Sequence, residues 1–346
     1  MAVEQTRRQR RWLMWTLIVL IALAAAGFGV FRYAVNHSTV SILDKTDALF
    51  GGTKGARVAV SGAKFGADPA QRLDVIVPDG PAPARPYPVV VFLYGGGWRS
   101  GVPEEYHFVG RMLAREGFVV VLSGYRLWPQ IHFPAMLEDG AASLRWTYDH
   151  IGQYGGDREQ IQLMGHSAGA YNAAMLALDR QWLGREGLPD GLIKGVVGLA
   201  GPYDFYPYTS DSTKRTFGMA PHPEVTQPVH FARADAPPML LANGAADTLV
   251  HARNAVALAK ALTNAGAPTR AVLFDGMSHE GILMKLAHPF DRDLRVKTAV
   301  LTFLRAQCVP TSVPMFPAAA PNQSPAHVQA QAQATAPSAA VQGKGG

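Results

Sequence analysis

Short runs of β-branched and other apolar residues recur between residues 73 and 274, and they constrain the fold more than any other feature of the sequence. Most of these runs are continuously apolar, as strands buried on both faces of a sheet are. Helical patterns separate them; Leu137, Ala141 and Leu144, for example, share one helical face. Strands that alternate with helices predict a mostly parallel sheet with helices on both faces, which is the α/β class. The predicted strands are 73–77, 89–93, 119–122, 161–164, 196–199, 239–241 and 271–274.

The composition indicates which parts of the chain can fold and which kinds of site it can contain. Of 346 residues, 48% are hydrophobic, which is enough for one large core and excludes disorder throughout. The single cysteine, Cys308, excludes an internal disulfide framework and a cysteine-based metal site. Residues 309–346 are rich in Ala, Pro and Gln without apolar periodicity, so we expect a disordered tail. The folded α/β domain is predicted at 71–308, after a linker at 35–70 that leads into it.

The N-terminal segment carries most of the net charge of +6. Residues 1–34 contain five arginines and a single acidic residue, Glu4. The rest of the chain is close to neutral, so a nucleic-acid-binding face is not indicated. From Trp12 to Phe31 the only polar side chain is Thr16, and such a helix would be about 30 Å long, as thick as a bilayer core. We therefore predict a basic cytoplasmic segment at 1–11 and a transmembrane anchor at 12–34. A signal peptide cleaved after Ala26 is the alternative, and both interpretations export the domain.

The motif Gly165-His166-Ser167-Ala168-Gly169 lies between the strand at 161–164 and an Ala-rich helix at 170–178. This setting is typical of a nucleophile elbow, in which a tight turn exposes a serine hydroxyl at the C-terminal edge of the sheet. Glycines flank the serine because side chains there would clash with the tight turn. The alternative is a glycine-rich turn without a catalytic role. The setting favours Ser167 as a nucleophile.

A serine nucleophile needs a base and a carboxylate that orients the base. In this architecture the acid and then the histidine follow the serine along the chain. His279 comes directly after the last predicted strand, and Asp247 follows the strand at 239–241, so both are expected at the same sheet edge as the serine. His251 and His288 are more typical of surface or capping residues. The residue four positions after His279 is Leu283, so the zinc-binding pair of metalloproteases is absent, and no metal is predicted.

The segment Tyr94-Gly95-Gly96-Gly97-Trp98 directly follows the strand at 89–93. Consecutive glycines allow backbone amides to approach a developing oxyanion without obstruction by a Cβ atom. We expect the amides of Gly95, Gly96 and Ala168 to form such an oxyanion hole. The spacing matches neither a dinucleotide-binding fingerprint nor a P-loop, so no nucleotide cofactor is predicted.

Together these motifs resemble those of the α/β-hydrolase serine esterases of the hormone-sensitive-lipase and feruloyl/acetyl-xylan-esterase-like (BD-FAE-like carboxylesterase) kind, which include kynurenine formamidases. The similarity extends from about Leu73 to Leu304 and is carried by VVVFLYGGGWRSG at 89–101 and IQLMGHSAGA at 161–170. It implies an α/β-hydrolase fold. It also implies a catalytic triad of Ser167, Asp247 and His279 and an oxyanion hole formed by Gly95, Gly96 and Ala168. The family usually has His where this chain has Tyr94.

The sequence thus predicts an exported, membrane-anchored serine esterase that acts on small-molecule esters without a cofactor. In a bacterium the catalytic domain would face the periplasm. We expect a short-acyl preference, because residues 203–236 are too few to form a large lid. An amide hydrolase of the kynurenine formamidase type is one alternative, although export would separate it from a cytosolic substrate. A catalytically silent binding protein is another, although such proteins typically lose a triad member.

Overall fold

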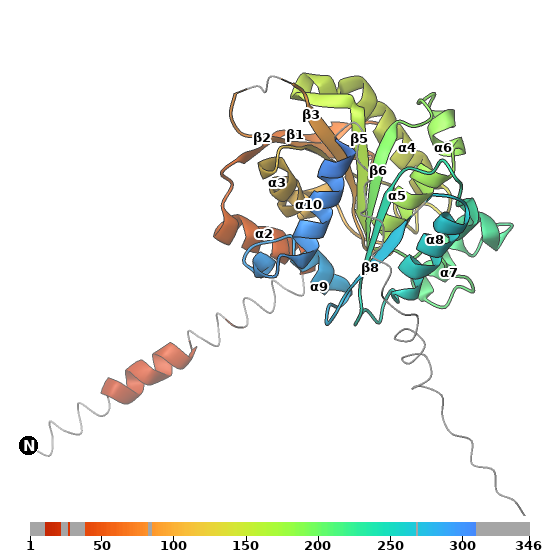
Figure 1. The fold of residues 1–346 in the computed structure, drawn as a ribbon. Coiled ribbons are helices and arrows are strands. Elements are labelled where there is room, and N and C mark those ends of the chain that lie inside the picture. The colour runs from red at the N-terminus through yellow and green to blue at the C-terminus, as the bar shows by residue number, and fades with distance from the viewer. Residues whose placement is uncertain (1–10, 22–26, 28–38, 82–84, 268, 309–346) are drawn as a thin grey trace, which may run out of the picture. The chain divides into compact units, whose positions relative to one another are not determined.

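A central eight-stranded sheet organises the protein, in the strand order β1-β2-β4-β3-β5-β6-β7-β8 (Figure 1). The computed structural model describes residues 11–21, 27, 39–81, 85–267 and 269–308. Strand β2 pairs antiparallel with β1 and with β4, and all other neighbouring strands pair in parallel. The mostly parallel sheet predicted from the sequence is therefore confirmed. The strands are β1 (Ala56–Lys64), β2 (Arg72–Pro78), β3 (Tyr87–Leu93), β4 (Val119–Ser123), β5 (Gly156–His166), β6 (Ile193–Leu199), β7 (Met239–Gly244) and β8 (Arg270–Phe274).

Burial explains which strands the sequence predicts. Residues 119–123 of β4 are all buried, as the central position of a strand covered on both faces requires. All seven predicted strands appear, as β2 to β8. Strand β1 was not predicted from the sequence, because this edge strand, whose Arg57 and Val58 are exposed, mixes small, charged and apolar residues without an apolar run.

Helices cover both faces of the sheet, with α3 and α10 on one face and α4, α5 and α8 on the other (Figure 1). On one face, the Gln162 side chain of β5 donates a hydrogen bond of 3.1 Å to the Leu304 carbonyl of α10. On the other, Gly140 of α4 lies against Leu176 of α5. Among the described residues from 39 onward, the α-helices are α2 (Thr39–Gly51), α3 (His107–Arg115), α4 (Ala135–His150), α5 (Ala168–Leu178), α6 (Gln181–Arg185), α7 (Asp211–Phe217), α8 (Arg253–Asn264), α9 (His279–Met284) and α10 (Arg295–Gln307). Short 3₁₀ turns are η1 (Pro103–Tyr106), η2 (Ile151–Tyr154), η3 (Pro223–Thr226), η4 (Pro228–Phe231) and η5 (Phe290–Arg292).

Helix α2 lies in the segment predicted as a linker, and a buried ion-pair network fastens it to the body. The Arg111 guanidinium of α3 donates to Asp44 at 2.8 Å and to Asp47 at 2.7 Å. Asp47 also accepts a hydrogen bond of 2.9 Å from the His288 amide, just after α9. Residues 39–51 are thus part of the folded body rather than a connecting segment.

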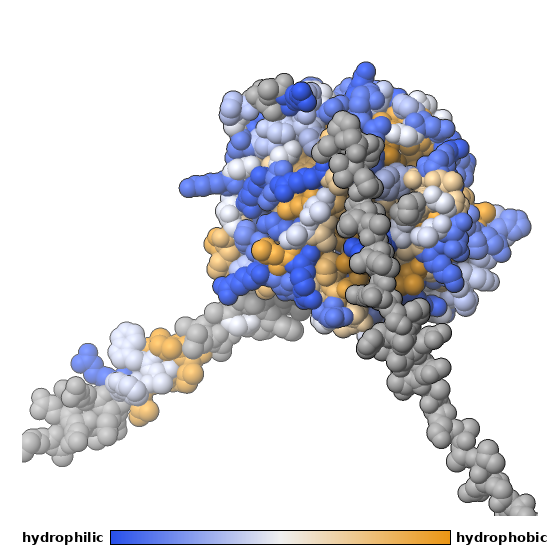
Figure 2. Space-filling model, viewed as in Figure 1, coloured by the Kyte–Doolittle hydropathy of each residue, from blue (hydrophilic) through white to orange (hydrophobic). Residues whose placement is uncertain are grey.

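The predicted membrane anchor is described only in part. Residues 11–21 are helical, and their apolar side chains are exposed, from 75% at Trp12 to 45% at Ile18 (Figure 2). Apart from Gly27, the remainder of the anchor lies outside the described residues, as does the predicted tail at 309–346. Among the residues that are described, no helix is both long and apolar enough to cross a membrane. The anchor stays a prediction.

Candidate active site

Ser167 occupies the turn between β5 and α5, and two glycines make that turn possible. Its backbone has a φ of 54°, a region that L-residues rarely adopt. A Cβ atom on Gly165 would lie 2.3 Å from the Gly169 carbonyl oxygen, and one on Gly169 would lie 2.0 Å from that of Leu93. The Ser167 amide donates a hydrogen bond of 2.8 Å to the Leu199 carbonyl at the end of β6. These contacts hold the serine at the C-terminal edge of the sheet.

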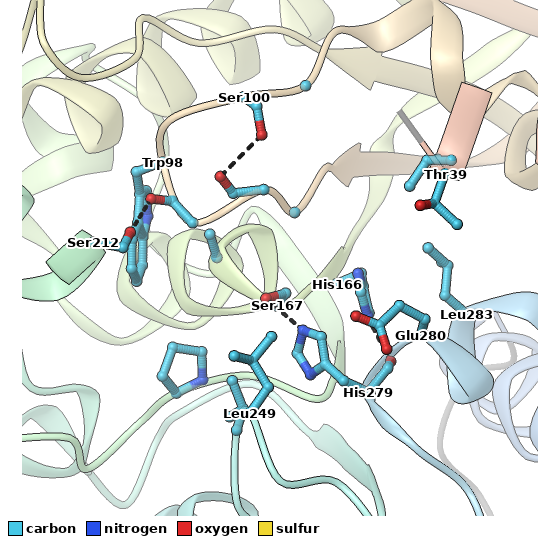
Figure 3. Close-up of a pocket in the computed structure, with 18 of the residues that line it drawn as sticks. Thr39, Trp98, Ser100, His166, Ser167, Ser212, Leu249, His279, Glu280 and Leu283 are labelled. Atoms are coloured by element: carbon cyan, nitrogen blue, oxygen red, sulfur yellow. Dashed lines mark hydrogen bonds between the residues drawn. The ribbon is translucent and has the colours of Figure 1, made fainter. Parts of the chain in front are cut away.

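The structure brings the three predicted polar residues into one hydrogen-bonded chain, of which Figure 3 shows the bond between Ser167 and His279. His279 Nε2 lies 2.9 Å from Ser167 Oγ, and His279 Nδ1 lies 2.8 Å from Asp247 Oδ2. All three side chains are buried, since Ser167 is 9%, His279 6% and Asp247 4% exposed. Each residue follows a different parallel strand, β5, β7 or β8, so the sheet itself sets their spacing.

The Asp247 carboxylate is held in place by the turn in which it sits. Its Oδ1 accepts hydrogen bonds from the amides of Leu249 at 2.9 Å and Val250 at 2.8 Å, which leaves Oδ2 for His279. Burial by itself raises the pKa of Asp247, but the hydrogen bonds from His279 and the two amides outweigh it and lower that pKa. The carboxylate is therefore ionised at neutral pH and can accept a hydrogen bond from the Nδ1–H group of His279.

The glycine loop after β3 lies directly beside the serine. A Cβ atom on Gly95 would lie 3.0 Å from both Ser167 Cβ and the His166 carbonyl oxygen, so a side chain here would push these neighbours away. Gly96 has a φ of 119°, which also requires glycine. Gly95, Gly96 and Ala168 all line the same cavity as Ser167, and Ala168 is the first residue of α5. The structure thus brings the predicted oxyanion-hole residues next to the predicted nucleophile.

Tyr94 lies behind this loop and does not line the cavity. Its ring stacks between those of Tyr106 and Tyr125, with centroids 5.7 and 4.5 Å away. Its hydroxyl donates a long hydrogen bond of 3.4 Å to the Tyr125 carbonyl. In the opposite direction, the Tyr125 hydroxyl donates a bond of 2.8 Å to the Tyr94 carbonyl. Because a peptide group is planar, this second bond also orients the Gly95 amide.

His166 is a site residue that the sequence analysis did not single out. Its Nε2 lies 3.1 Å from the His279 carbonyl oxygen and, because a carbonyl only accepts, it must carry the proton. Burial, together with the neighbouring His279, lowers the pKa of His166 to about 3, so the ring is neutral at physiological pH. His166 therefore connects the serine turn to the backbone of the histidine loop. Its position inside the G-x-S-x-G motif was the only signal in the sequence.

The active-site cavity has a volume of about 760 Å³ and is lined by backbone and side chains from α2, the glycine loop, the segment 202–213, the Asp247 turn and α9. Ser167 and His279 both face into it (Figure 3). Within the described ranges, no group of three or more His, Cys, Asp or Glu side chains is placed to hold a metal ion.

Comparison with known proteins places these features in a family. The BD-FAE family model matches residues 73–262. A probable isoprenylcysteine alpha-carbonyl methylesterase from Oryza sativa subsp. japonica is 29% identical over 64% of this chain and 58% of its own length. Esterase LipC from Mycobacterium tuberculosis is 30% identical over 54% of this chain and 50% of its own length. The chain thus spans little more than half the length of these curated relatives.

A solved structure, esterase B from Lactobacillus rhamnosis, has a TM-score of 0.66 at 19% identity and covers 82% of this chain and 94% of its own. At that identity the likeness shows the fold alone, which is the α/β-hydrolase fold. The sheet order and the positions of the strand-end residues described above agree with that fold.

Proposed function

The chain belongs to the BD-FAE family, and on that premise we propose that it is a serine carboxylic-ester hydrolase with Ser167, His279 and Asp247 as its catalytic triad. The observation that carries this proposal is the unbroken hydrogen-bonded chain from Asp247 Oδ2 through His279 to Ser167 Oγ inside a cavity. Esterase names among the relatives support it.

In the proposed mechanism, Ser167 Oγ attacks the ester carbonyl carbon while His279 Nε2 takes its proton. Asp247 holds the ring with Nδ1 protonated and stabilises the imidazolium that forms. The amides of Gly95, Gly96 and Ala168 donate to the oxyanion. The imidazolium then protonates the leaving alcohol oxygen, and water, deprotonated by His279, hydrolyses the acyl-enzyme.

We further propose that the domain works on the exported side of a membrane, attached through residues 12–34. The support for this is the sequence alone: an apolar segment preceded by four arginines. We propose short-acyl esters as substrates, since residues 203–236 are too few for a large lid.

Replacement of the nucleophile tests this proposal. We expect Ser167→Ala to reduce kcat on p-nitrophenyl acetate by a factor on the order of 10⁶, because removal of a triad nucleophile has that effect in serine hydrolases. The melting temperature should change little, since alanine keeps the Cβ atom of Ser167 and adds no atom to the turn. A Ser167→Ala protein that keeps most of its activity would rule out this nucleophile. An N-formyl amide cleaved faster than the ester would favour the amide hydrolase instead.

A further inference from the structure

The active-site cavity extends to both sides of Ser167 (Figure 3). Trp98 and Ser212 lie on one side of the serine, and Thr39 and Leu283 lie on the other, where α2 and α9 meet. We refer to the part next to Trp98 and Ser212 as the first arm, and to the part between α2 and α9 as the second arm. An ester also has two parts, the acyl group and the alcohol, so each arm can receive one of them.

The position of His279 decides this assignment. The imidazolium must deliver its proton to the leaving alcohol oxygen, so that oxygen lies against His279 when the acyl-enzyme forms. His279 is the first residue of α9, and Leu283 and Met284 of the same helix line the second arm. The alcohol therefore extends into the second arm, and the acyl group is left for the first.

The first arm is closed by rigid aromatic packing. The Trp98 ring makes edge contacts with Phe217 and Tyr171, at centroid distances of 4.7 and 5.3 Å. Its Nε1 donates a hydrogen bond of 3.1 Å to the buried Asn172 side chain. Ser212 Oγ donates a hydrogen bond to the Gly97 carbonyl and so links α7 to the glycine loop on this side of the cavity. A long acyl chain would have to break these contacts.

The second arm has apolar side chains from both helices, and the polar Thr39 and Glu280 also contribute to its lining. Val40 and Leu43 of α2, Leu283 and Met284 of α9, and Phe290 of η5, which is 38% exposed, all line the cavity. Leu43 and Leu283 are buried, whereas Val40 and Met284 are half-buried and available to a ligand. The Arg111 network that fastens α2 keeps this wall in place without a ligand.

We propose that the preferred substrates are esters of a short acid with a long, apolar alcohol, whose alkyl chain lies in the second arm between α2 and α9. This proposal rests on the proposed esterase function and deepens it. The apolar side chains of the lining supply the specificity, since methylenes that enter such a pocket together raise kcat/KM by about 10-fold or more.

Two isomeric esters test the proposal directly with the full-length protein. Hexyl acetate and ethyl hexanoate have the same atoms and similar hydrophobicity, but their long chains are on opposite sides of the ester bond. We expect kcat/KM for hexyl acetate to exceed that for ethyl hexanoate by about 10-fold or more. Equal values, or faster hydrolysis of ethyl hexanoate, would overturn the assignment of the arms.

A matched pair of variants on α2 locates the effect. Val40→Trp fills the second arm and should lower kcat/KM for hexyl acetate about 10-fold more than kcat/KM for ethyl acetate. Leu49→Trp lies on the same helix, but Leu49 is 78% exposed and does not line the cavity, so this variant should match wild type on both esters. Equal losses on both esters in Val40→Trp, or an unaltered hexyl acetate rate, would overturn the proposal.

Failure of the esterase function itself would look different. In that case neither isomer would be hydrolysed in a Ser167-dependent manner, and Ser167 would not react with a fluorophosphonate. Ser167-dependent hydrolysis of both isomers without the expected preference would leave the esterase function standing and overturn only the arm assignment.

Discussion

At the residue scale, Tyr125 and Tyr94 behind the glycine loop are expected to have different roles. Tyr125 positions the loop through a hydrogen bond, whereas Tyr94 mainly fills space. The Tyr125 hydroxyl bonds the Tyr94 carbonyl at 2.8 Å, whereas the Tyr94 hydroxyl makes only the 3.4 Å contact. We expect Tyr125→Phe to lower kcat about tenfold with KM nearly unchanged, because an oxyanion-hole donor that is loosened costs less than the 10²–10³ of one that is lost. Tyr94→Phe should stay close to wild type. Steady-state kinetics of both variants test this prediction. A larger loss of kcat in Tyr94→Phe than in Tyr125→Phe would contradict it.

His166 is predicted to act as a positioning residue for the histidine loop. His166→Met removes the Nε2 donor to the His279 carbonyl while keeping an apolar side chain of similar reach. We expect kcat to fall several-fold without a matching change in KM, because the ground-state contacts of the ester are elsewhere. His166→Gln offers an amide donor at a similar distance and should recover part of kcat. Equal loss in both variants would indicate packing rather than hydrogen bonding.

Site residues that directly follow a buried strand could be predicted from the sequence. Site residues whose role depends on a contact with a distant part of the chain could not. Ser167, Asp247 and His279 were found because parallel strands bring their C-terminal ends to one edge. The role of His166 depends on a carbonyl 113 residues away, and nothing in the local sequence indicates where its ring points. The same holds for Tyr125, whose hydroxyl bonds a residue 31 positions earlier.

At the scale of elements, α2 depends on a single buried cation. Arg111 is 7% and Asp47 2% exposed, so Arg111→Met would leave two aspartates without their charge partner. We expect the free energy of unfolding to fall by about 3–5 kcal/mol, the usual cost of breaking a buried ion pair from one side. Chemical denaturation measures it.

A neutral variant provides the control for the Arg111 prediction. Arg111→Met combined with Asp44→Asn and Asp47→Asn removes the unpaired charges, so part of the lost stability should return. No recovery in the triple variant would indicate that Arg111 acts through its packing alone.

The same network explains why α2 escaped the sequence analysis while β2 to β8 did not. Continuous apolar strands are recognisable locally, but α2 has few buried apolar residues and is fastened by Arg111, 64 and 67 positions further along the chain. That α2 packs against the folded domain can therefore be seen in the structure but could not be predicted from the sequence.

At the scale of the whole molecule, the proposed anchor determines how the protein fractionates. We expect the protein to sediment with membranes and to resist both high salt and carbonate, because insertion of an apolar helix, unlike the binding of a basic patch, does not depend on salt. Immunoblotting of the fractions provides the measurement. A mature protein that begins near Gly27 would instead indicate a cleaved signal peptide.

The most direct test of the central claim is covalent labelling by a fluorophosphonate, followed by peptide mass spectrometry. A nucleophilic serine activated by His279 reacts with this reagent, and an ordinary serine does not. We predict one equivalent of label per chain, located on Ser167, with labelling lost in Ser167→Ala and greatly slowed in His279→Ala. Labelling at another serine, or none in a protein that is folded, would contradict the proposed triad.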